Sequence, residues 1–217
     1  MDYELEMREA ALLAMRGDVP SAIEKYQRCR HEWPDRFEPA LQLLDLFTSE
    51  QRFDEADVVA SEIVRRWPRD PDAAHALSRL RELQGRPVEA LALLRGSGAR
   101  LFPDSNAYPD YLRLLLANSR YDEAVIEADL GLERPVLWRP MALLAKIIAL
   151  VQQGRGGETL PLFEELDVDD FADLVDDWAA HLKRAGVLGR IQENLERTAA
   201  AAPAHARLAS LRRRFSS

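Results

Sequence analysis

Four histidines and one cysteine are the side chains of this 217-residue chain best suited to metal binding or nucleophilic catalysis. The histidines, no two of which share a helical turn, are His31, His75, His181 and His205. Cys29 alone cannot build a thiolate zinc site, and we expect it to be a packed thiol. Asp177 and His181 are four residues apart and could share a helix face. Because two ligands do not make a metal site, we expect His181 to be either packed or paired with Asp177.

Motifs of known catalytic chemistry are missing from the sequence. It has no phosphate-binding glycine loop, no His-Glu-x-x-His pair and no serine nucleophile elbow. An enzyme would need a pocket that gathers His75, Arg79 and Arg113 around a small molecule. Nothing in the sequence supplies a nucleophile together with its base, so we predict no enzymatic activity, no cofactor and no metal.

Two charge clusters lie in the last third of the chain. The acidic cluster is Asp167, Asp169, Asp170, Asp173, Asp176 and Asp177. The basic cluster is Arg207, Arg212, Arg213 and Arg214. We favour structural roles for both, because carboxylates suit a helix start and arginines suit the end of a terminal helix. The alternatives are a contact surface for a basic partner and a docking tail for an acidic partner or membrane.

Composition limits the class of partner and the compartment. The net charge of −8 disfavours nucleic acid, which requires a concentrated basic face. The acidic N-terminus has no apolar region of a signal peptide, and the apolar stretch 141–151 is too short to cross a bilayer. With a single cysteine as well, we expect a cytoplasmic protein without membrane insertion.

The elements that position these residues follow an internal repeat. Four alanines recur at one fixed interval along the chain: Ala22, Ala56, Ala90 and Ala124. The chain is rich in the helix formers Leu, Ala, Glu and Arg, and few stretches alternate with period two. A period of about 34 residues on a helical background predicts stacked helical hairpins and essentially no sheet.

Turn and connector residues divide the chain into about six units of two helices each. We expect the turn inside each unit at Gly17, Gln51, Gly85, Ser119, Gly154 and Gly186. Connectors between units are Trp33-Pro34-Asp35, Trp67-Pro68-Arg69-Asp70 and Phe102-Pro103-Asp104. Proline cannot continue the preceding helix, and the aspartate that follows can cap the next one.

These residues resemble a tetratricopeptide repeat protein. The family signature has a small residue, an aromatic or apolar residue four positions later and a late proline. The first unit has Ala22, Tyr26 and Pro34 at these positions. The fifth and sixth units depart from the signature, with Thr159 and Ile191 in place of the alanine. The connectors are similar to those of bacterial chains, so we expect a bacterial protein.

The resemblance implies an all-α, right-handed superhelical solenoid of about six antiparallel helix pairs. We expect one array over residues 1–217, with clear repeats at 3–136 and degenerate repeats at 137–203. A capping helix at about 204–215 would close the end, with one apolar face formed by Leu208, Leu211 and Phe215.

In this family the first helices line a concave groove, so the resemblance also implies a binding surface. The groove positions are Leu41, Gln42, Asp45, His75, Arg79, Glu82, Asp110, Arg113, Leu144 and Ile148. We expect a non-catalytic adaptor that binds a protein or peptide segment there. The clamp of chaperone-binding members is absent from the equivalent positions. The alternatives are a targeting or regulatory module of a glycosyltransferase or sulfotransferase, and self-association into a homo-oligomer.

Overall fold

The computed structural model describes residues 2–68, 70–96, 107–133 and 139–216. These residues form helices and turns and contain no β-strand. The chain divides into two compact units, Met1–Ala99 and Arg100–Ser217. The expected connector Phe102-Pro103-Asp104 lies outside the described residues. The continuity of a single array from one unit to the other stays a prediction.

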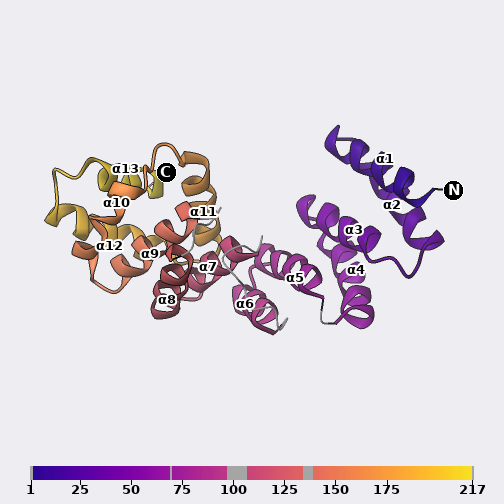
Figure 1. Ribbon diagram of the computed structural model, residues 1–217, viewed down its shortest axis with the longest axis horizontal. Coiled ribbons are helices and arrows are strands. Elements are labelled where there is room, and N and C mark those ends of the chain that lie inside the picture. The colour runs from indigo at the N-terminus through magenta and orange to yellow at the C-terminus, as the bar shows by residue number, and fades with distance from the viewer. Residues whose placement is uncertain (1, 69, 97–106, 134–138, 217) are drawn as a thin grey trace. The chain divides into compact units, whose positions relative to one another are not determined.

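Unit 1 consists of three successive helix pairs (Figure 1). Its helices are α1 (Tyr3–Met15), α2 (Val19–Glu32), α3 (Glu38–Ser49), α4 (Phe53–Arg66), α5 (Pro71–Leu83) and α6 (Pro87–Gly96). Each helix packs against the next one in the chain through α6, and α3 also packs directly against α5. This is the arrangement expected of stacked helical hairpins, in which each pair buries its apolar face against its neighbours.

Unit 2 begins with the same kind of pairing and ends differently (Figure 1). Its helices are α7 (Tyr108–Ala117), α8 (Tyr121–Leu132), α9 (Arg139–Gln152), η1 (Gly156–Thr159), α10 (Leu162–Glu165), α11 (Ala172–Arg184), α12 (Leu188–Ala201) and α13 (Ala206–Phe215). Helix α9 is central, because α7, α8, η1, α10 and α12 all pack against it. The prediction of an all-α fold built from consecutive helix pairs is confirmed.

The period of the four alanines reappears in the helix starts. Helices α2, α4, α6 and α8 begin at Val19, Phe53, Pro87 and Tyr121, which are separated by that same interval. In three of these helices the residue before the start is an arginine that pairs with the glutamate three positions later. Arg52 pairs with Glu55 at 2.6 Å, and the same pair recurs one and two periods later. The repeated Arg-x-x-Glu sequence therefore fixes the entry into the second helix.

All six predicted turn residues adopt a left-handed backbone. They are Gly17, Gln51, Gly85, Ser119, Gly154 and Gly186, with φ between 57° and 80°. At Gly85, the Arg86 N–H donates to the Arg81 carbonyl at 2.8 Å, which is the long hydrogen bond of a Schellman helix end. The sequence therefore placed every hairpin turn at the correct residue.

The four alanines of the repeat are completely buried, as the close packing of paired helices requires. The fifth unit departs from this pattern, because its expected second helix is replaced by η1 and the single turn α10. Gly156 and Gly157 are weak helix formers, and Pro161 lacks an amide proton for helix bonding. Thr159 is also fully buried, and its hydroxyl donates to the Gly156 carbonyl at 2.6 Å.

The C-terminal helix α13 covers the end of unit 2. It packs against α11 and α12, and Leu208, Leu211 and Phe215 are all buried. These three residues are the apolar face expected from the sequence. The helix thus closes the hydrophobic core of unit 2 with one face and presents arginines on the other.

Candidate functional site

The candidate site is a surface on the two adjacent first helices α3 and α5 of unit 1. We call it the first-helix face and define it by Leu41, Gln42, Asp45, His75 and Arg79. The Arg79 guanidinium donates to the Asp45 carboxylate at 3.2 Å, which joins the two helices across a separation of 34 residues. Both side chains remain accessible, at 45% for Arg79 and 37% for Asp45. Leu41, Gln42 and His75 lie about one helical turn before this pair on the same two helices, and each of them is partly buried.

Helix α1 extends this surface through its first turn. The Tyr3 hydroxyl donates to the Glu38 carboxylate at 3.1 Å, and the Tyr3 ring packs edge-on against Trp33 with centroids 5.3 Å apart. One repeat later, Phe37 and Trp67 make the same edge-on contact at 5.1 Å. The tryptophan of each Trp-Pro connector thus packs at the start of a first helix, and equivalent ring contacts hold the starts of α1 and α3.

The electrostatics of the first-helix face centre on Asp45. Burial raises the pKa of the Asp45 carboxyl, and the nearby Arg79 and His75 partly oppose this increase. A partly desolvated carboxylate beside two basic side chains offers both an acceptor and donors within a small area. The site can therefore recognise polar groups of either kind, while Leu41 supplies an apolar contact on the same helix.

The other five predicted groove residues are not accessible in this way. In unit 1, Glu82 is 8% exposed. In unit 2, Arg113 is 3% exposed and pairs with Asp110 at 2.6 Å. Leu144 and Ile148 are completely buried in the central helix α9, where an apolar floor was expected. These side chains pack within their own units, so we leave them out of the candidate surface.

Helix α11 accounts for the burial on α7. It packs against α7, where the sequence placed an open groove. Asp177 of α11 lies in the field of Arg113, which helps to lower the pKa of its carboxyl, although the larger cause is the interaction with His181. The His181 ring lies 3.3 Å from the Asp177 carboxylate, which agrees with the pairing that the four-residue spacing allows. The covering of α7 was missed, and its only sequence signal is the irregular sixth repeat.

The two charge clusters of the sequence pair with each other. Arg214 of α13 contacts Asp176 at 3.0 Å and Asp169 at 3.6 Å, and Arg207 contacts Asp167 at 3.4 Å. The acidic segment and the arginine helix therefore form one internal network of ion pairs. This arrangement favours the structural roles over the contact surface and the docking tail.

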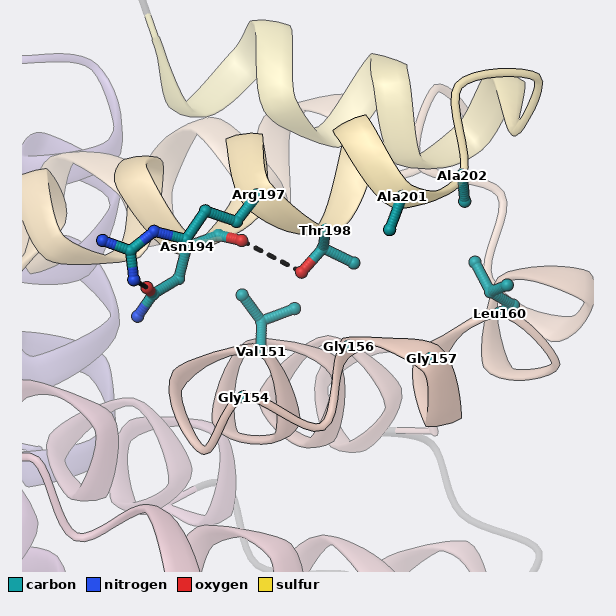
Figure 2. A pocket seen from close by; sticks show the side chains of 10 residues that line it. All are labelled: Val151, Gly154, Gly156, Gly157, Leu160, Asn194, Arg197, Thr198, Ala201 and Ala202. Atoms are coloured by element: carbon teal, nitrogen blue, oxygen red, sulfur yellow. Dashed lines mark hydrogen bonds between the residues drawn. The ribbon is translucent and has the colours of Figure 1, made fainter.

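Unit 2 also contains a pocket of about 320 Å³ between η1 and α12 (Figure 2). Gly156 lies so close to Thr198 that a β-carbon on the glycine would be 2.4 Å from the threonine hydroxyl oxygen. Figure 2 shows the Thr198 hydroxyl bonded back to the Asn194 carbonyl, at 2.9 Å. Arg197 at the same edge pairs with Glu193. The polar groups of this pocket thus satisfy one another, and none of them forms a nucleophile–base pair.

Among the described residues, no three His, Cys, Asp or Glu side chains are grouped so that they could hold a metal ion. No helix in the described ranges is long and apolar enough to span a bilayer.

The fold can now be compared with known proteins. No family model matches the sequence, and no curated protein matches it either. Among solved structures, a tetratricopeptide repeat protein from Parabacteroides merdae has a TM-score of 0.62 and 17% identity, covering 98% of this chain and 85% of its own. TTC0263, a tetratricopeptide repeat protein of Thermus thermophilus, has a TM-score of 0.58 and 18% identity, covering 83% of this chain and 99% of its own.

A third similar structure is that of Naa15/Naa10 bound to HypK-THB. The match has a TM-score of 0.60 and 14% identity, and it covers 98% of this chain but 33% of the other chain. At these identities the likeness concerns the fold. The fold of this chain is that of tetratricopeptide repeat proteins.

Proposed function

We propose that this chain is a non-catalytic adaptor, located in the cytoplasm, that binds a segment of a partner protein along the first-helix face of unit 1. The observation that carries the proposal is the accessible Asp45–Arg79 pair, which links two successive first helices on one surface. Buried Cys29, a free thiol, agrees with a reducing compartment.

The repeat gives the surface a regular composition. Positions one period apart are equivalent, so Met7, Leu41 and His75 form one row across α1, α3 and α5. A segment that crosses these helices meets apolar side chains first and basic ones last. Packed helices lie 8–10 Å apart, so three of them span roughly 20 Å. An extended segment of about six residues covers that length, at about 3.3 Å per residue.

Site-specific photo-crosslinking tests the proposal. A photoreactive amino acid at Gln42 should capture a partner from lysate of the native host, whereas one at Val88, which is 72% exposed on α6, should not. Arg79→Glu should abolish capture at Gln42 because it reverses the charge beside Asp45. The control Arg65→Glu, an exposed position on α4, should leave capture unchanged.

Equal capture from Gln42 and Val88 would contradict the proposal, as would capture that survives Arg79→Glu. Identification of the captured species decides the remaining alternatives. A glycosyltransferase or sulfotransferase would favour a regulatory module, and a second copy of the chain would favour self-association.

A further inference from the structure

A second pocket lies in unit 1 and shares only helix α5 with the first-helix face. It has a volume of about 430 Å³ and lies between α4 and α6, with α5 as its floor. Its lining residues are Val64, Trp67, Pro68, Asp70, Ala73, Ala74, Leu77, Glu89, Ala92, Leu93 and Gly96. Most of these side chains are apolar, and the volume is within the range of small-molecule sites.

The repeat shows why the pocket is open here. One period earlier, the Arg30 guanidinium lies 3.5 Å from the Glu62 carboxylate, and this ion pair bridges α2 and α4. The residues at the same positions of the next repeat are Val64 and Gly96, which have neither the length nor the charge to form a bridge. Ala92 likewise replaces the larger Val58. Three substitutions between equivalent positions thus leave this pocket without the larger side chains of the preceding repeat.

The aromatic wall of the cavity is held in place before any ligand binds. Trp67 packs edge-on against Phe37, and the Arg66 guanidinium lies 4.7 Å from the centroid of the Trp67 ring. Leu77, in the floor, is 5% exposed and belongs to the core of unit 1. A fixed aromatic wall and a fixed floor reduce the ordering cost of binding an apolar molecule.

Charges at the rim select against anions. Among the described lining residues the charged ones are Asp70 and Glu89, and both are carboxylates. Asp70 accepts the amides of Asp72 and Ala73 at 3.0 Å, while Glu89 pairs with Arg86 at 2.6 Å. In addition, α4 and α6 end at the pocket, and helix C-termini carry partial negative charge. At the rim formed by Asp70 and Glu89, these groups favour a neutral or cationic molecule over an anion.

We propose that this pocket is a binding site for a small apolar molecule of aromatic size that is neutral or cationic. Helix α5 contributes to both sites, but none of the residues that define the first-helix face lines this pocket. The absence of the Arg30–Glu62 type of bridge is what makes it accessible.

The experiment restores that bridge. The double variant Val64→Arg, Gly96→Glu introduces across the pocket the residue types of the Arg30–Glu62 pair of the preceding repeat. We call it the closed variant. The probes are 2-naphthylmethylamine, a cation, and 2-naphthoate, an anion of similar size, and their binding is followed by saturation-transfer NMR. The amine should bind the unmodified protein at least tenfold more tightly than naphthoate does, and at least tenfold more tightly than it binds the closed variant.

The matched control is Ser61→Arg with Val88→Glu, which adds the same charges to exposed positions of α4 and α6 outside the pocket. It should bind the amine as the unmodified protein does. If the closed variant does not fold, Ala92→Trp fills the cavity from α6 and should give the same loss. Absence of amine binding to the unmodified protein, undiminished binding to a closed or filled variant, or equal binding of naphthoate would each overturn the proposal.

Discussion

Arg214 donates two hydrogen bonds to the carboxylate of Asp176, 38 residues earlier, at 3.0 and 3.2 Å. The pair joins the last helix of unit 2 to α11, and the neighbouring Asp169 extends it into a network. Because these side chains are partly exposed, water screens each pair and a single one contributes little to stability. Their joint effect is to hold α13 over the acidic segment.

Acid should weaken the attachment of α13 through Asp169. The Ser210 hydroxyl donates to its carboxylate at 2.7 Å, and this bond, with Arg214, holds the pKa of Asp169 below its ordinary value. A lowered pKa gives a stabilisation that is complete above about pH 5 and is lost as the pH falls through about 4 towards the folded-state value. Asp169→Asn should therefore reduce the change of the urea unfolding midpoint with pH over this range. Asp170→Asn, at the exposed neighbouring position, is the control. If the urea midpoint changed with pH equally in both variants, the result would count against the network.

Gly131 should not tolerate a larger residue. A β-carbon there would lie 2.1 Å from the hydroxyl of buried Tyr108, which donates to the Glu127 carbonyl at 2.8 Å. We expect Gly131→Ala to destabilise the protein by about 1–3 kcal/mol through overpacking. Tyr108→Phe removes the clashing oxygen, so the double variant should be less destabilised than the sum of the single changes. Additive effects in denaturant titrations would show that the two side chains do not meet.

Introducing a glycine at one hairpin turn and removing the glycine at the equivalent turn should have opposite effects on stability. Gln51 has a φ of 57°, where a side chain is strained, whereas Gly85 adopts a φ of 74° without one. Gln51→Gly should stabilise the protein by up to about 1 kcal/mol, and Gly85→Ala should destabilise it by about 1 kcal/mol. Thermal unfolding of the two variants measures both shifts. Shifts of the same sign would mean that the left-handed backbone is not what distinguishes these turns.

Cys29 should be unreactive in the folded protein. Its side chain is fully buried, and burial raises the pKa of the thiol, so the reactive thiolate is scarce. We expect labelling by iodoacetamide to be at least a hundredfold slower than in urea. Because it is the only cysteine, the labelling rate reports opening of unit 1. Ala56→Trp, which overpacks the same unit, should accelerate labelling, and fast labelling of the unmodified protein would argue for an exposed thiol.

The repeat made most of the fold predictable. A residue such as Ala56 has the same neighbours as its copies one period away, so one pattern specifies the turns, the helix starts and the buried positions together. The face of α13 was equally readable, because Leu208, Leu211 and Phe215 follow the helical period without reference to other helices.

The candidate site was only half predictable, since contacts outside the repeat are not encoded in its period. Arg113 and Arg79 occupy equivalent positions, one period apart, and the sequence treats them alike. Arg113 is buried within unit 2, where α11 packs against α7, whereas Arg79 is accessible on α5 of unit 1. The packing of α11 depends on the final helices, whose spacing is irregular. The pairing of Asp176 with Arg214 likewise cannot be predicted from the acidic cluster or from the basic cluster taken alone.

The uniform spacing of helix starts has a practical consequence for chain length. Residues 53–86 begin at the first residue of one second helix and end immediately before the first residue of the next. A duplicate of this segment inserted after Arg86 would enter and leave at matched backbone positions, with its own left-handed turn at the Gly85 copy. Unit 1 could thus be elongated by one hairpin without designing a new loop, which would place an additional first helix after α5.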